Sequence, residues 1–314
     1  MKRLVTLSSV LCVIWISCYA QQDPSSSLYM YKTEIYNPGA IGVDGLFNIT
    51  ASSRKQWVGF EGAPFTASFT ASAPITIAHT KHGVGLTVES DDIGFDSNIS
   101  FSGSYAYLWD MGLGTLGIGV NLGMINTNLD PKWFIPGGSA FTPAEQDPLI
   151  PTNNESFVAF DAGLGIYLSN ENYYVGISVK HLNKPKIKYS EATPYFSRHY
   201  YLTGGYIFQL SNPSFEIIPS AQGLLCDGIM QLTTTALVRY NKKLWGGLSY
   251  RTSDALIGSV GLELYNGIKI CYAYDLPLSK IRTATSGSHE IVVNYSFDFS
   301  LGKSTMQYKS IRLL

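Results

Sequence analysis

The stretch Asn98-Ile99-Ser100-Phe101-Ser102-Gly103-Ser104-Tyr105-Ala106-Tyr107 decides the fold, because its side chains alternate between two characters. Small and polar residues occupy one face of an extended chain, and the other face carries Ile99, Phe101, Tyr105 and Tyr107. The same period of two returns over residues 293–299. Alternation of this kind is typical of a strand with an apolar face and a polar face, and here we expect the polar face to line a lumen.

Comparable segments of about ten residues, separated by turn-forming residues, follow one another from Leu46 onward. We expect strands near residues 46–54, 64–74, 83–91, 97–108, 114–125, 156–168, 173–182, 199–210, 214–222, 229–240, 244–252, 256–265, 268–275 and 288–299. The pattern predicts an all-β fold, a transmembrane antiparallel β-barrel of about 14 strands of the bacterial outer-membrane type, over residues 46–300.

The connections between these segments alternate in length, as they do in outer-membrane barrels with short periplasmic turns and long external loops. The short turns lie near residues 110–112, 169–172, 211–213, 241–243 and 265–267. The longest loops span about 125–155 and 183–198, and a somewhat long connection at 74–82 is an exception on the periplasmic side. In this register residues 21–45 form a periplasmic N-terminal segment, and residues 301–314 form a periplasmic C-terminal tail.

Composition agrees with a membrane location and excludes one class of partner. Charged residues make up 14% of the chain, against roughly 25% in soluble domains. After residue 20 no apolar run is long enough for a transmembrane helix, which leaves a closed barrel as the way to span a bilayer and meet outer-membrane lipids. A net charge of -1 offers no basic excess for binding nucleic acid.

The first twenty residues read as a signal peptide for Sec export. Lys2 and Arg3 precede an apolar stretch, and Ala20 provides a small-residue cleavage site. Acylation of Cys18 as a lipoprotein is an alternative. With cleavage after Ala20, the mature chain keeps Cys226 and Cys271, which could form one disulfide.

No constellation of nucleophile, base and orienting group indicates an enzyme, and no cofactor motif is present. His79 and His82 lack neighbouring metal ligands, so we expect no metal there. The acidic group at residues 91–96 reads as a solvated turn rather than a calcium loop. Charged residues inside predicted strands should point inward, where they either line a channel or pair across a filled lumen; these are Lys180, Glu263, Arg239 and Lys269.

Two motifs resemble the PorP/SprF family of type IX secretion system membrane proteins. The first runs from Gln22-Asp23-Pro24 to the turn Asn37-Pro38-Gly39-Ala40-Ile41-Gly42. The second is Arg54-Lys55-Gln56-Trp57-Val58-Gly59-Phe60-Glu61-Gly62-Ala63-Pro64, which is similar to the family's Arg-x-Gln-Trp loop and Gly-Ala-Pro. The tail resembles the family's closing sequence, except that Ile311 replaces a proline and Leu314 an aromatic residue.

The resemblance implies a non-enzymatic outer-membrane role in secretion or surface attachment of cargo with C-terminal targeting domains, gliding adhesins included. The implied partners are that cargo and other type IX subunits, namely periplasmic proteins and lipoproteins. The sequence places the loop residues Arg54, Gln56, Trp57 and Phe60 outside the cell as candidates for partner binding, with an aromatic anchor at the membrane interface as the alternative. In the tail, Lys309 and Arg312 are candidates for periplasmic docking, or simply parts of a solvated end. A passive channel for small solutes remains a second hypothesis for the whole chain.

Overall fold

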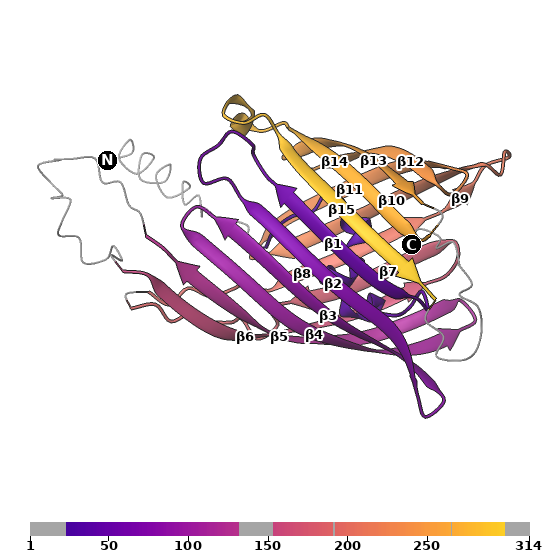
Figure 1. The fold of residues 1–314 in the computed structure, drawn as a ribbon, viewed down its shortest axis with the longest axis horizontal. Helices are drawn as coiled ribbons and strands as arrows, with labels where there is room; N and C mark the ends of the chain where they lie inside the picture. The colour runs from indigo at the N-terminus through magenta and orange to yellow at the C-terminus, as the bar shows by residue number, and fades with distance from the viewer. Residues whose placement is uncertain (1–22, 132–152, 191, 265, 299–314) are drawn as a thin grey trace, which may run out of the picture.

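The computed structural model describes residues 23–131, 153–190, 192–264 and 266–298, and these form an antiparallel barrel around a short N-terminal segment (Figure 1). The strands are β1 Phe47–Lys55, β2 Phe65–Ile77, β3 Thr80–Ile93, β4 Asp96–Met111, β5 Gly114–Leu129, β6 Glu155–Ser169, β7 Tyr173–Lys180, β8 His199–Tyr206, β9 Phe208–Gln209, β10 Phe215–Cys226, β11 Ile229–Tyr240, β12 Leu244–Arg251, β13 Ala255–Glu263, β14 Ile268–Pro277 and β15 Ser288–Phe297.

The strands close into a ring of fourteen, as the sequence predicted. β8 and β9 are two pieces of one wall strand, since both pair with β10 and only Ile207 separates them. The wall closes where β1 pairs with β15, and Phe47 lies opposite Phe297. In Figure 1 the indigo β1 and the yellow β15 lie side by side. Both ends of the wall are therefore at the same end of the barrel.

Each predicted segment corresponds to a strand whose ends differ by a few residues, and one expectation about the turns is wrong. β2 and β3 extend to Ile77 and Thr80, so the connection expected at 74–82 is a two-residue turn of Ala78 and His79. Both turn residues have positive φ, 48° and 64°, which matches the twist of a tight hairpin. The turn is therefore short, like the others at that end.

The two faces of the wall divide as the alternation predicts. Phe101 and Ile99 of β4 are 55% and 51% exposed on the outside, whereas Ser104 on the inner face is 8% exposed. Large apolar side chains such as these face outward, whereas the inner face combines Ser, Thr and charged residues with buried apolar side chains such as Leu237 and Ile257. Among the described residues no helix is long and apolar enough to cross a membrane.

The N-terminal segment lies inside this ring. It consists of the 3-10 turn η1 (Tyr29–Tyr31), the single helical turn α2 (Thr33–Tyr36) and the 3-10 turn η2 (Pro38–Ala40). Leu28 and Ile41 are fully buried, and together with neighbouring aromatic residues they pack against the inner wall. We expected residues 21–45 to form a periplasmic segment; the structure instead places residues 23–45 in the lumen, because their apolar and polar side chains find partners on the wall. We call residues 23–45 the plug.

Two further sequence questions concern the cysteines and the tail. Cys226 and Cys271 are both buried, and both are free thiols. The disulfide that they could have formed is therefore absent from the structure. Residues 301–314, with Lys309 and Arg312, lie outside the described residues.

Candidate functional site: the plug and its contacts

Glycines on the inner wall allow the plug backbone to approach the strands closely. A Cβ atom added to Gly39 would lie 2.7 Å from the carbonyl oxygen of Gly117 in β5 and 2.9 Å from that of Gly165 in β6. A Cβ at Gly83 of β3 would collide with the backbone of Ile41. Such contacts are possible only where side chains are absent, so these glycines form a surface matched to the plug.

Polar groups of the plug form hydrogen bonds with several strands of the wall. The Asn37 side chain donates from Nδ2 to the carbonyl oxygens of Ile166 at 3.0 Å and Ile177 at 3.3 Å, which belong to β6 and β7. Its Oδ1 accepts from the amide of Gly39 at 2.9 Å and so fixes the turn. Ser178 of β7 donates to the carbonyl oxygen of Tyr36 at 2.7 Å. The first sequence motif thus builds the contact between the plug and the wall.

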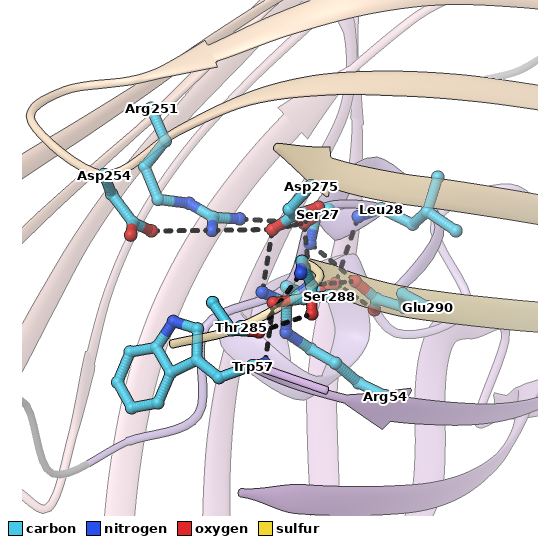
Figure 2. Close-up of polar contacts among 12 residues, drawn as sticks. Ser27, Leu28, Arg54, Trp57, Arg251, Asp254, Asp275, Thr285, Ser288 and Glu290 are labelled. Carbon is cyan, nitrogen blue, oxygen red and sulfur yellow. Dashed lines mark hydrogen bonds and ion pairs between the residues drawn. The ribbon is translucent and has the colours of Figure 1, made fainter. Parts of the chain in front are cut away.

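A buried charged cluster holds the start of the plug, and we call it the Ser27 node: Ser27, Arg54, Arg251, Asp275 and Glu290 (Figure 2). Ser27 Oγ accepts from Arg54 Nη1 at 2.8 Å and Arg251 Nη2 at 3.0 Å, and donates to Asp275 Oδ1 at 2.6 Å. The Ser27 amide donates to Glu290 Oε2 at 2.6 Å. One plug residue therefore contacts strands β1, β12, β14 and β15, by way of their side chains.

Ion pairs within the wall balance the charges of the node. Arg54 pairs with Asp275 at 2.8 Å and with Glu290 at 3.3 Å, and Arg251 pairs with Asp275 at 3.1 Å. Lys32 of the plug adds a contact of 3.7 Å with Glu290. Buried charges are tolerated only when they are paired and hydrogen-bonded, and in this node every ionic group has an opposite charge beside it.

The expected inward charges are confirmed as inward-facing. Arg239 is 2% exposed and donates from Nε to Glu216 Oε2 at 2.6 Å, across the β10–β11 pair. Lys269 is 5% exposed, and Lys180 pairs with Asp23 of the plug at 2.9 Å. Glu263 is partly buried and lies directly opposite Lys269 in the β13–β14 pair, so it points to the same inner face. The described contacts favour the interpretation in which inward charges pair within a filled lumen.

Burial also changes the acid–base properties of the plug. Burial inside the lumen raises the pKa of Glu34 from 4.5 to about 8, and the nearby Asp44 carboxylate adds to the effect. Ser72 Oγ donates a hydrogen bond of 2.7 Å to Glu34 Oε1, and this bond lowers the pKa of Glu34 in part. Burial likewise raises the pKa of Asp44. Glu34 is therefore a carboxyl whose charge state in the docked plug changes near neutral pH.

The spaces around the plug differ strongly in size. Two cavities that border it inside the barrel measure about 100 and 80 Å³. A cavity of about 800 Å³ lies among the loops at the end of the barrel where β1 ends, and its lining includes Asp23, Gln56, Trp57, Met230 and Asp254. The inner cavities have room for a few waters. The large cavity is a vestibule with the first plug residues in its wall.

The loop residues predicted to bind partners separate into two groups. Arg54 is 2% exposed and bonded within the Ser27 node, so its guanidinium faces the lumen and not an external partner. The Gln56 amide donates to the Pro64 carbonyl at 2.9 Å, which closes the base of the loop. Trp57 has φ 48°, its amide donates to Ser288 Oγ at 3.1 Å, and its indole points away from the node (Figure 2). Phe60, at 47% exposed, is the most outward of them.

Sequence reasoning missed the acidic partners of Arg54, although one signal was available. Glu290 is an even number of residues away from Asn294 and Ser296 in the same strand. The alternation of side chains therefore places all three on the inner face. Arg54 lies directly opposite Glu290 in the β1–β15 register. Knowing that the two strands pair would have been enough to predict this ion pair.

With this geometry described, comparison with known proteins identifies the family. A family model described as type IX secretion system membrane protein PorP/SprF matches residues 18–295. The chain belongs to the PorP/SprF family. The match includes both sequence motifs, the plug and nearly the whole wall. This PorP/SprF protein is accordingly an outer-membrane β-barrel component of the type IX secretion system.

Other comparisons add little to this assignment. Among curated proteins none matches the chain. Similar solved structures include Acinetobacter baumannii Omp33, with 9% identity, a TM-score of 0.44 and coverage of 80% of this chain and 98% of the other. A Pseudomonas aeruginosa FadL homologue and the P. putida toluene transporter TodX each show 10% identity, with TM-scores of 0.48 and 0.47, and cover 88% of this chain and 95% of theirs. The fold described above rests on the strand pairing and not on these likenesses.

Proposed function

We propose that this protein is a non-enzymatic platform of the type IX secretion system that supports the secretion or surface attachment of cargo with C-terminal targeting domains, gliding adhesins included. The observation that carries the proposal is the plug, which the Ser27 node and the glycine surface hold inside the lumen. A barrel with a filled lumen acts through its two ends. Its activity is binding, at surfaces that the wall keeps in fixed positions.

The two ends of the barrel bind different partners. The end that carries the Trp57 loop and the vestibule of about 800 Å³ faces the outside and meets cargo. At the opposite end all the connections between strands are short, and with the basic tail residues Lys309 and Arg312 this end contacts periplasmic proteins and lipoproteins of the same system. In this arrangement the protein links cargo at the surface to the machine beneath it.

Deletion of the gene tests the proposal directly. Surface proteins with C-terminal targeting domains are quantified by protease shaving and mass spectrometry in the deletion strain and in a complemented strain. We expect one or more such proteins to disappear from the surface and to return on complementation. Unchanged surface display in the deletion strain would refute the proposal.

A passive solute channel is the alternative, and it requires a path past the plug. The purified protein in a planar bilayer is expected to give no steady single-channel current, because the plug is held by buried hydrogen bonds and ion pairs. A stable conductance in the wild-type protein, together with normal surface display in the deletion strain, would establish the channel instead.

A further inference from the structure

Three potential metal ligands meet where the start of the plug contacts the β7–β8 part of the wall. A carboxylate oxygen of Asp23 and one ring nitrogen each of His181 and His199 all lie within 4.8 Å of one another. The exposed fractions of the three residues are 7%, 3% and 0%, so the group is shielded from solvent. Asp23 comes from the plug, whereas the histidines follow β7 and begin β8. The cluster therefore joins two parts of the chain that are more than 150 residues apart.

Each histidine is oriented by a second hydrogen bond of the kind that accompanies metal-binding imidazoles. His181 Nδ1 lies 3.0 Å from Asp161 Oδ1, and His199 Nδ1 lies 2.9 Å from the carbonyl oxygen of Ser197. A carboxylate or backbone carbonyl at Nδ1 holds the proton there and leaves the lone pair of Nε2 free to bind a metal. His199 is thus arranged to present Nε2, whereas Nε2 of His181 must first give up its hydrogen bond to the Asp23 carboxylate.

One nitrogen of His199 is not accounted for by hydrogen bonds within the cluster. Its Nε2 is buried and has no hydrogen-bond partner among the described residues. An unpaired buried polar atom costs about 1 to 3 kcal/mol, so it calls for a ligand. His181 Nε2 lies 2.8 Å from Asp23 Oδ1, a separation that a metal bound to both atoms would also permit.

We propose that Asp23, His181 and His199 bind a divalent transition-metal ion of the Zn²⁺ class. Two imidazole nitrogens and one carboxylate oxygen are a donor set that suits this ion, with water in the fourth position. A cavity of about 80 Å³ lined by Asp23, Asp161 and His181 has room for that water. Lys180 Nζ lies 2.9 Å from Oδ2 of Asp23, which leaves Oδ1 for the metal.

The position of the site determines what the ion does. The vestibule, whose lining includes Asp23, gives the ion a route in from the barrel end. Once bound, the ion ties the first described residue of the plug to the segments on either side of the β7–β8 loop. It therefore acts as a structural tie that strengthens docking of the plug, independently of which cargo the protein serves.

Metal binding by the full-length protein tests the proposal. The protein is purified in detergent with an affinity tag that contains no histidine, stripped with a chelator, and titrated with Zn²⁺ or with Co²⁺ as a spectroscopic probe. We expect one ion per chain, Co²⁺ absorption bands typical of a nitrogen- and oxygen-ligated site, and slower amide exchange in residues 23–36 when metal is bound.

Variants distinguish this site from adventitious binding. His199→Gln and Asp23→Asn are expected to lower the affinity at least 100-fold, since loss of an orienting partner alone costs about 10- to 100-fold. His79→Gln, at an exposed turn, is the matched control and should bind like the wild type. Heat-modifiable migration on gels verifies that each barrel is assembled.

Two results would overturn the proposal. One is that the stripped wild-type protein takes up no metal, in which case His181 with protons on both nitrogens bridges Asp161 and Asp23 by hydrogen bonds alone. The other is that assembled His199→Gln and Asp23→Asn bind metal as tightly as His79→Gln does.

Discussion

Removal of the Arg54 guanidinium should loosen the plug without opening the wall. Arg54→Met keeps the apolar stem of the side chain and deletes the group that donates to Ser27 Oγ at 2.8 Å. The pairs of Arg54 with Asp275 and Glu290 lie within the wall, so they are present whether or not the plug is docked. Among the described residues, the bond to Ser27 is the direct contact of Arg54 that exists in the docked state alone.

The size of the effect follows from that single bond. A hydrogen bond to a charged group contributes about 1.5 to 3 kcal/mol. Ser27 keeps its bonds to Arg251, Asp275 and Glu290 in the variant, so we take about 2 kcal/mol as the loss in docking free energy. At about 1.4 kcal/mol for each factor of ten, this is roughly a 30-fold change in the docking equilibrium.

Hydrogen exchange with mass spectrometry measures this equilibrium in detergent or nanodiscs. Peptides covering residues 26–36 should exchange roughly 30-fold faster in Arg54→Met, while peptides from β4 and β5 keep their wild-type rates. The matched control is Lys81→Met, which removes a cation from the exposed pair with Asp110, where a change of at most about 1 kcal/mol is expected. Unaltered exchange of residues 26–36 in an assembled Arg54→Met barrel would refute the role assigned to the Ser27 node.

Three other predictions use the same preparation or the deletion strain. Gly39→Ala places a methyl group 2.7 Å from the Gly117 carbonyl oxygen and should weaken docking of the plug by about 1 to 3 kcal/mol. Amide exchange of the plug should then be faster. Gly112→Ala is the control, because its added methyl group meets open space and should leave plug exchange unchanged. Because docking raises the pKa of Glu34 from 4.5 to about 8, its contribution to docking is complete below pH 4.5 and is lost as the pH rises through 8. Glu34→Gln should flatten this part of the pH dependence of plug exchange, and an unchanged profile would contradict the assignment. Trp57→Ala should assemble at normal yield and lose cargo display, whereas low barrel yield with normal display per barrel would identify Trp57 as a membrane anchor.

The wall could be predicted from sequence because it obeys a local rule. Alternation such as that around Phe101 repeats within each strand, and turn residues mark the ends, so no knowledge of distant contacts is needed. The turn at Ala78 and His79 was misjudged because positive φ at two residues other than glycine leaves little trace in the sequence. Even there the strands were found, and only their ends moved.

The plug could not be predicted in the same way, because its contacts are almost all with residues far along the chain. Ser27 bonds to Glu290, 263 residues away, and Asn37 bonds to Ile166, 129 residues away. The segment has no helical or strand period that would assign a buried face. Glycines such as Gly117 at inward positions were the available sign that another backbone approaches the wall, but they do not say which one.

The make-up of the Ser27 node also sets an order of events during biogenesis. Ser27 precedes every strand of the wall, yet its partners Asp275 and Glu290 belong to the last two strands. Contacts of such high sequence separation form late, since the intervening chain must first be brought into place. The barrel must therefore curve and bring β14 and β15 beside β1 before its lumen can be filled. The Ser27 node can be complete only after β15 has been inserted. A protein truncated before β15 would therefore keep an undocked N-terminal segment that quality-control proteases can reach.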